Sequence, residues 1–391
     1  MAKKNWMVTT SELDDKQREI FNAVLDKSCV VSGCAGSGKS VLALLKAQRI
    51  QQERGNDSCQ VIVYTKALND FMKKAKDDLK LSSRFLYYEE WLWKKEMKRY
   101  GKMGLLPVLL KDENSNKIPN KPSSDYVIID EIQDFTSSEI QDFLTATNKY
   151  FFFFGDTAQS IYDGYKVGGT MRVNSIVPTF FPNGNVKEFT LFYNHRLPIP
   201  VAKLAQYIGV NLPTFDEGIY KSQESVLPKM ICYKSKKDQL DAINRIISDN
   251  DMDDVAILLP KSQEVKNVYE NLKIMQKKEH PINYEVKYSV EDTGDDGVVH
   301  KEFKDNLNFD STNPKIMTYH SAKGLQFETV FIPYIEDYYH DGADGSKALY
   351  VAMTRTYRNL YIMYTGVLPV PLDKVKPDIY QTTEVETMEE K

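Results

Sequence analysis

Nine apolar runs of strand length, separated by segments of helical periodicity, constrain the fold of this chain more than any other feature. They lie at 28–33, 60–65, 126–130, 150–155, 229–234, 255–260, 315–320, 329–334 and 360–365. The runs are continuously hydrophobic rather than alternating, as expected of parallel strands covered by helices on both faces. Because they fall into two clusters, the sequence predicts an α/β fold with two lobes, each a parallel sheet flanked by helices.

The two clusters set the expected domain limits. The first cluster ends near Phe192, and a predicted helix over 199–207 leads toward the second. The predicted parts are lobe 1 at 1–196, lobe 2 at 197–370 and a flexible tail at 371–391. A small insertion at about 80–124 interrupts lobe 1, and a weakly patterned stretch with an acidic turn lies at 280–312.

The composition is that of a globular chain without membrane spans. Of 391 residues, 42% are hydrophobic and 27% charged, and no run approaches the ~20 apolar residues of a membrane helix. The net charge of −4 argues against a uniformly basic nucleic-acid binder but allows a positive groove on one face. The four cysteines lack CxxC spacing, so we expect no zinc site. Without an apolar signal core at the start, a cytoplasmic location is expected.

A glycine-rich run directly follows the first apolar strand and is the strongest candidate site. It comprises Gly33, Cys34, Ala35, Gly36, Ser37, Gly38, Lys39 and Ser40, a complete GxxxxGK[ST], and it opens a helical segment. Glycines allow backbone N–H groups to surround phosphate oxygens. Lys39 is expected to neutralise the β and γ phosphates of ATP, and Ser40 to bind Mg²⁺. The alternative, a glycine-rich turn without a ligand, is disfavoured by the strand and helix on its two sides.

Two acidic residues end the apolar run at 126–130. A carboxylate at the end of a buried strand is costly unless it binds a cation or a partner, so Asp130 is expected to contact Mg²⁺. Glu131, which follows it, is expected to polarise the attacking water. A strand ending in Asp-Glu is common by itself. Together with the glycine-rich run, it predicts nucleotide hydrolysis.

Further motifs occur in a defined order along the chain. They are LDDKQREIFNAV at 13–24, DEIQD at 130–134, GDTAQSIYD at 155–163, LFYNHR at 191–196, TYHSAKGLQFETVFIP at 318–333 and ALYVAMTRTYRNLYI at 348–362. In this order, the motifs resemble those of superfamily 1 DNA helicases of the UvrD/Rep type, in a minimal form that lacks large inserted subdomains. The resemblance implies two RecA-like P-loop NTPase lobes with ATP hydrolysed between them.

Three residues receive nucleotide-binding roles from this resemblance. Gln17 stands where the family's glutamine reads the adenine edge. Its alternative role is that of an exposed polar residue on an amphipathic helix opened by a Ser11-x-x-Asp14 cap. His195 stands where a tyrosine usually stacks on adenine, and Gln326 where a glutamate is usual.

Three more residues are assigned to the γ-phosphate by the resemblance. Gln159 would sense this phosphate and couple it to the nucleic-acid groove. Arg196 and Arg355 would both reach it, which suits a reaction that needs stabilisation of developing phosphate charge. For a single isolated arginine, a surface position would be the simpler interpretation.

Nucleic-acid contacts are also implied by the resemblance. The candidates are Tyr64, Tyr165, His320, Ser321 and Lys323. Gly164 stands where the family usually has a base-stacking tryptophan, and Tyr165 follows it; stacking contributes ~1–3 kcal/mol per base. Tyr64 is equally consistent with an ordinary strand aromatic. The lysine-rich stretch 87–102 either contacts nucleic acid or forms an amphipathic helix, with Tyr88, Trp91 and Leu92 in the core.

Two functional hypotheses of different classes follow. The first is an ATP hydrolase that translocates along single-stranded nucleic acid or unwinds DNA, 3′ to 5′ by resemblance, in a setting such as DNA repair. The alternative is an ATP-driven switch subunit that regulates a partner such as a nuclease, with little autonomous unwinding. Expected partners are single-stranded DNA, with RNA not excluded, and a nuclease or loading factor, but no membrane. A small-molecule kinase would not account for the second lobe.

Overall fold

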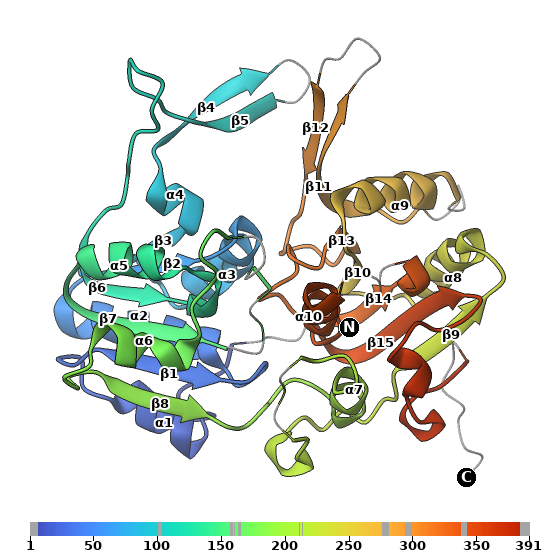
Figure 1. Cartoon of the computed structure of the whole chain (residues 1–391), viewed down its shortest axis with the longest axis horizontal. Helices are drawn as coiled ribbons and strands as arrows, with labels where there is room; N and C mark the ends of the chain where they lie inside the picture. The colour runs from blue at the N-terminus through green and yellow to red at the C-terminus, as the bar shows by residue number, and fades with distance from the viewer. Residues whose placement is uncertain are drawn as a thin grey trace. The chain divides into compact units, whose positions relative to one another are not determined.

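The computed structural model describes residues 7–100, 104–156, 159, 161–162, 166–210, 212, 214–275, 281–293, 299–337 and 342–383. The chain divides into two compact units, whose elements are labelled in Figure 1. The N-terminal unit comprises Trp6–Cys34 and Gly38–Phe192, and the C-terminal unit includes Ala35–Ser37 and Tyr193–Lys391. Each unit contains its own sheet and its own hydrophobic core.

The sheet of the N-terminal unit has six parallel strands in the order β3-β2-β6-β7-β1-β8. The strands are β1 (Cys29–Gly33), β2 (Cys59–Val63), β3 (Arg84–Tyr87), β6 (Ser124–Ile129), β7 (Thr147–Gly155) and β8 (Lys187–Leu191). The carboxyl ends of β1, β6 and β7 meet at one edge because all three run in the same direction. This edge carries the glycine-rich run and the acidic pair.

Helices cover both faces of this sheet (Figure 1). They are α1 (Asp15–Asn22), α2 (Lys39–Arg54), α3 (Lys66–Asp78), α4 (Tyr88–Leu92), α5 (Ser137–Thr145) and α6 (Val173–Phe180), with a 3₁₀ turn η2 (Ile132–Asp134). Side chains alternate along a strand, and β7 shows the result. Phe151 and Phe153 pack in the core that includes residues of α5 and α6, whereas Phe152 lies under the ammonium group of Lys46 in α2.

The sheet of the C-terminal unit has the order β12-β11-β13-β10-β14-β15-β9, and among its described strands only the β11–β12 pair is antiparallel. The strands are β9 (Lys229–Tyr233), β10 (Val255–Leu259), β11 (Glu285–Thr293), β12 (Val299–Asp305), β13 (Lys315–Thr318), β14 (Phe327–Ile332) and β15 (Thr356–Thr365). Its helices are α7 (Ile199–Ala205), α8 (Lys236–Asp249), α9 (Ser262–Met275) and α10 (Gly342–Met353), with 3₁₀ turns η5 (Glu217–Ile219), η6 (Ile335–Asp337), η8 (Leu372–Lys374) and η9 (Pro377–Ile379).

All nine predicted strands are present, so the α/β class with two parallel sheets flanked by helices is confirmed. The start of α1 differs from the sequence interpretation. Its N-cap is Asp14, whose carboxylate accepts a hydrogen bond from Gln17 N, while Gln17 Oε1 accepts one from Asp14 N. The Ser11-x-x-Asp14 cap was therefore wrong, because Ser11 instead bonds with the Thr9 hydroxyl outside the helix.

The helix proposed for 87–102 is also wrong beyond Leu92. After the short α4, the chain forms a hairpin of β4 (Lys95–Tyr100) and β5 (Gly104–Leu109). The partner strand contains Pro107, which suits a β edge better than a helix. Trp91 is buried as expected, and its indole N–H donates to the Pro122 carbonyl at 3.2 Å.

The stretch at 280–312 contains an ordered hairpin of β11 and β12, although part of its acidic turn lies outside the described residues. Val286, Tyr288 and Val290 alternate along β11 and pack into the same core as α9. Residues 371–383 also differ from the expected flexible tail. Leu372 is buried, and Gln381 pairs with Lys229 of β9. No helix in the described part of the chain has the length and hydrophobicity of a membrane span.

Candidate nucleotide site

The loop between β1 and α2 needs glycine at two positions. Gly36 and Gly38 have φ angles of 72° and 84°, in the left-handed region that side chains rarely adopt. A Cβ atom at Gly36 would lie 2.4 Å from Asn194 Oδ1, and one at Gly38 would lie 2.6 Å from Gln17 Nε2. Gly38 is the N-cap of α2, and no side chain caps this helix. Its first backbone N–H groups therefore point toward the loop, as a phosphate site requires.

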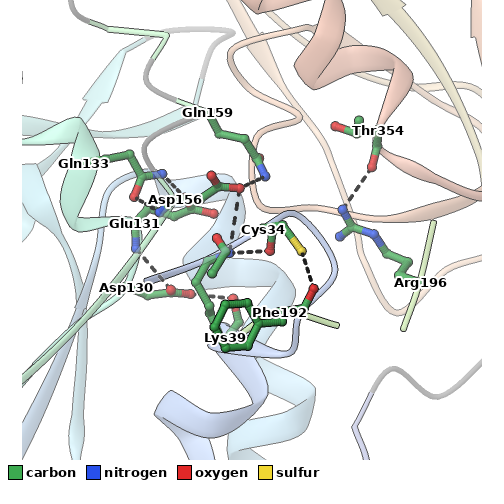
Figure 2. Close-up of polar contacts among 12 residues, drawn as sticks. Cys34, Lys39, Asp130, Glu131, Gln133, Asp156, Gln159, Phe192, Arg196 and Thr354 are labelled. Carbon is green, nitrogen blue, oxygen red and sulfur yellow. Dashed lines mark hydrogen bonds and ion pairs between the residues drawn. The ribbon is translucent and has the colours of Figure 1, made fainter. Parts of the chain in front are cut away.

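Lys39 and Ser40, the first two residues of α2, both make polar contacts at this edge of the sheet, and Figure 2 shows those of Lys39. The Lys39 ammonium group donates to the carbonyls of Gly33 at 3.0 Å and Cys34 at 2.8 Å. It therefore lies inside the curve of the glycine loop, where the phosphates of a nucleotide would be bound. Ser40 Oγ donates to Asp130 Oδ2 at 2.5 Å.

Asp130 is fully buried at the end of β6. Burial, followed by the adjacent charge of Glu131, raises the pKa of Asp130 to about 7, although the hydrogen bond from Ser40 opposes this shift. A bound divalent cation would stabilise the ionised Asp130 carboxylate and so offset the cost of burying its charge. The hydroxyl of Ser40 and the carboxylate of Asp130 are hard oxygen ligands in contact with each other, which is the type of donor that Mg²⁺ prefers. The residues therefore fit this metal.

Glu131 has an uncommon backbone conformation for its residue type. Its φ and ψ angles are 58° and 42°, in the left-handed region. A non-glycine residue there costs of order 1–3 kcal/mol and persists only where its surroundings hold it. The Gln133 side chain, which donates to Glu131 Oε2, is one such restraint. The turn directs an acidic side chain that follows β6 into a buried polar cluster.

This cluster extends to the end of β7 and includes two residues that sequence reasoning missed, Gln133 and Asp156. The backbone N–H of Asp156 donates to Gln133 Oε1 at 2.9 Å, and Asp156 Oδ2 accepts from Gln159 Nε2 at 2.8 Å (Figure 2). The same Oδ2 lies 3.9 Å from the Lys39 ammonium group. Both missed residues belong to motifs already identified, and their polar character next to apolar strand ends was the available signal.

The three residues expected to bind the base or ribose have different surroundings. Gln17 is buried and lies against Gly38, so the structure brings it to the glycine loop. The side chain of His195 is exposed, and its backbone N–H donates to the Gly36 carbonyl at 2.9 Å. Gln326 is half-buried in the C-terminal unit, just before β14.

The two arginines assigned to the γ-phosphate both belong to the C-terminal unit and both contact Thr354. Arg196 Nη2 donates to the Thr354 carbonyl at 2.9 Å (Figure 2). Arg355 donates to the Thr354 hydroxyl at 3.1 Å and to the Val351 carbonyl at 2.8 Å. The side chain of Arg355 is only 1% exposed, which excludes a surface arginine for that position in this structure.

Among the described residues, the candidates for nucleic-acid binding are half-buried or buried, and they are divided between the two units. The Tyr64 ring packs 4.4 Å from the Tyr162 ring, and the Lys166 ammonium group lies 4.7 Å from the Tyr64 ring centre. In the C-terminal unit, His320 and Ser321 are half-buried, whereas Lys323 is buried. Tyr165 lies outside the described residues.

Comparisons with known proteins match both parts of the chain. A model of an AAA domain matches residues 17–165, and a model of the UvrD-like helicase C-terminal domain matches residues 315–363. No curated protein matches the sequence.

Two solved structures show weak overall similarity. The C-terminal domain of a possible DNA helicase from Lactobacillus plantarum WCFS1 is 17% identical, with a TM-score of 0.34, and covers 48% of this chain and 98% of that one. Arterivirus nonstructural protein 10, a helicase, is 14% identical, with a TM-score of 0.38, and covers 89% of this chain and 61% of that one.

The two family models cover most of the candidate residues of each unit, but not His195 or Arg196. The AAA model contains the glycine loop, the acidic pair and Gln159, and the UvrD-like model contains Arg355. Residues 17–165 are therefore similar to an AAA domain, and residues 315–363 to the C-terminal domain of UvrD-like helicases, which supports an ATP-hydrolysing enzyme of the UvrD-like helicase type.

Proposed function

We propose that this protein is an ATP- and Mg²⁺-dependent motor that translocates along single-stranded DNA in the 3′-to-5′ direction. The observation that supports this proposal best is the polar cluster at the sheet edge of the N-terminal unit. There, the phosphate-binding Lys39 lies near Asp156, which is itself hydrogen-bonded to Gln159. A nucleotide on Lys39 would therefore change the surroundings of Gln159, as coupling of hydrolysis to movement requires.

In this proposal, the residues of the N-terminal unit divide the chemistry among them. Lys39 neutralises the β and γ phosphates, Ser40 and Asp130 hold Mg²⁺, and Glu131 accepts the proton of the attacking water. Bound Mg²⁺ would supply charge neutralisation on the phosphate oxygens. Gln17, beside Gly38, is the candidate for recognition of the base.

The two arginines are proposed to act on the γ-phosphate during turnover. In the present structure, Arg196 donates to a neutral backbone carbonyl, that of Thr354. A phosphate oxygen is a stronger acceptor because its hydrogen bonds with arginine are charge-assisted. Nucleotide binding can therefore compete with Thr354 for this side chain.

A second candidate function is an ATP-driven switch that regulates a partner such as a nuclease or a loading factor. One observation favours it. Among the described residues, the segment between β3 and β6 contains only α4 and the β4–β5 hairpin, and the segment between β11 and β13 contains only the β12 hairpin strand. Such small additions offer little surface for contact with duplex DNA ahead of a motor. A cytoplasmic role in DNA repair is proposed for the motor, not for the switch.

ATP turnover with and without a single-stranded oligonucleotide separates the two candidates. Strong stimulation by DNA, lost in Lys39→Ala, supports the motor. Turnover that is indifferent to both DNA and RNA supports the switch. Duplexes with a 3′ or a 5′ single-stranded tail then test polarity, because a 3′-to-5′ motor displaces the strand only from the 3′-tailed duplex.

A further inference from the structure

We infer that Gln133 is a positioning residue that holds Glu131 in its reactive orientation and links it to Asp156. The inference rests on the proposed function, in which Glu131 is the general base. Gln133 lies in η2, directly after the acidic pair, and its side chain is fully buried. Both polar atoms of its amide have a partner within the N-terminal unit.

The two hydrogen bonds determine the orientation of this amide. Gln133 Nε2 donates to the Glu131 carboxylate, and Gln133 Oε1 accepts from the Asp156 backbone N–H at 2.9 Å. A flipped amide would place its oxygen against the carboxylate and its NH₂ group against the N–H, so both contacts would become repulsive. Only one orientation satisfies both neighbours, and the Glu131 side chain is therefore restrained by a rigid planar group.

Gly155 makes this contact possible. A Cβ atom at Gly155 would lie 2.6 Å from Gln133 Oε1 and 2.7 Å from Ile132 Cγ2. Any larger residue would displace the Gln133 amide from the end of β7. The absence of a side chain at the end of β7 thus leaves the space that the Gln133 amide occupies. The hydrogen bond between Gln133 and Asp156 depends on this space.

The same chain of contacts reaches the phosphate-binding lysine. Gln133 binds the backbone N–H of Asp156, and the carboxylate of Asp156 lies 3.9 Å from the Lys39 ammonium group. A phosphate that draws the Lys39 ammonium group away from Asp156 would leave the Asp156 carboxylate without this nearby positive charge. A movement of Asp156 that follows would be passed through Gln133 to the Glu131 carboxylate. The orientation of the base would therefore depend on whether a phosphate is bound at Lys39.

The first experiment compares Gln133→Met with Gln141→Met. Methionine has a similar length but offers neither hydrogen bond, and Gln141 is an exposed amide on α5 that serves as a matched control. We expect Gln133→Met to lower kcat by about tenfold to a hundredfold, which is the typical loss of activity when a residue that orients a functional side chain is removed. The KM for ATP should change by less than about threefold, since Lys39 and the glycine loop are untouched.

A double-mutant cycle with Glu131→Gln tests whether Gln133 acts through Glu131. If it does, adding Gln133→Met to Glu131→Gln should lower the residual single-turnover rate by less than about twofold, because the positioned group is already gone. Gln133→Glu is a second variant in case the methionine does not fold. It retains the acceptor for Asp156 but places a carboxylate against Glu131, and we expect a fall in kcat of the same order.

Several results would overturn the inference. They are an unchanged kcat in a folded Gln133→Met protein, a rise in KM alone, or an additive tenfold loss in the Glu131→Gln background. Each of these, with an active wild type, leaves the proposed function intact. A wild-type protein that does not hydrolyse ATP would refute both, because Glu131 would then have no reaction to serve.

Discussion

The first helix after the first strand begins differently in the two units. In the N-terminal unit, α2 follows a glycine loop, has Gly38 as its N-cap, and receives no capping bond from a side chain. In the C-terminal unit, α8 follows β9 and is capped by Ser235, whose hydroxyl accepts from Asp238 N at 3.2 Å. One helix thus leaves its N–H groups to a ligand, whereas the other satisfies them internally. Of these two helices, α2 is therefore the one whose start is suited to bind phosphate.

The candidate catalytic side chains also differ in their partners. Those of the N-terminal unit contact one another, as in the bonds of Asp130 with Ser40 and of Asp156 with Gln159. The arginines of the C-terminal unit donate mainly to backbone carbonyls, including those of Val351 and Thr354. Side-chain networks preorganise charge for a reaction, whereas neutral carbonyls hold an arginine in place until a stronger acceptor arrives.

The largest expected effect comes from removing the first lysine of α2. Lys39→Ala should reduce ATP turnover to background, because both phosphate binding and charge stabilisation are lost; a single stabilising donor already accounts for about a hundredfold to a thousandfold. The matched control is Lys236→Ala at the first position of α8, where the ammonium group pairs with Asp337 and lies 5.3 Å from the Tyr334 ring centre. Equal losses in steady-state turnover would contradict the distinction between the two helices.

Glu131→Gln should separate binding from hydrolysis in the N-terminal network. Glutamine keeps the shape of the side chain but cannot accept the proton of water, so kcat should fall by about a hundredfold or more. Binding of a fluorescent ATP analogue should remain within about threefold of wild type. Full turnover in this variant would rule out Glu131 as the base.

Replacing the two arginines by methionine should have unequal effects on stability. Arg355→Met leaves the Val351 carbonyl without this donor in a buried region, at a cost of about 1–3 kcal/mol. Arg196→Met affects a half-buried side chain and should cost less than about 1 kcal/mol. Thermal unfolding would measure this difference, and turnover of ATP should fall in both. If Arg196→Met retains full turnover, its assignment to the γ-phosphate is wrong.

The smallest effect should come from the cap of α8. Ser235→Ala removes the side-chain acceptor for Asp238 N, and loss of an N-cap typically costs about 1 kcal/mol. Chemical denaturation should detect this change, while ATP binding stays the same. A substantial loss of ATP affinity would show that α8 has a more direct nucleotide role than its capped start indicates.

Prediction from the sequence succeeded where a strand is continuously hydrophobic and failed where it is short or exposed. Strands β2 and β10 are buried along their whole length, and both were found. Strands β3 and β8 were missed because they expose charged residues; in β8, only the third and fifth positions are buried. The hairpin in the lysine-rich stretch was missed because its strands are stabilised by pairing with each other, which a helical pattern does not reveal.

The sequence by itself determined the parallel α/β architecture and the phosphate loop, because burial on two faces demands apolar strands and the loop demands glycine at Gly36 and Gly38. Only the tertiary structure decided which polar groups meet. Glu131 and Asp156 are far apart in the chain, and the parallel pairing of β6 with β7 brings their strand ends to one edge, where Gln133 joins them. Hydrogen bonds act over about 3 Å, so such contacts depend on strand register rather than on composition.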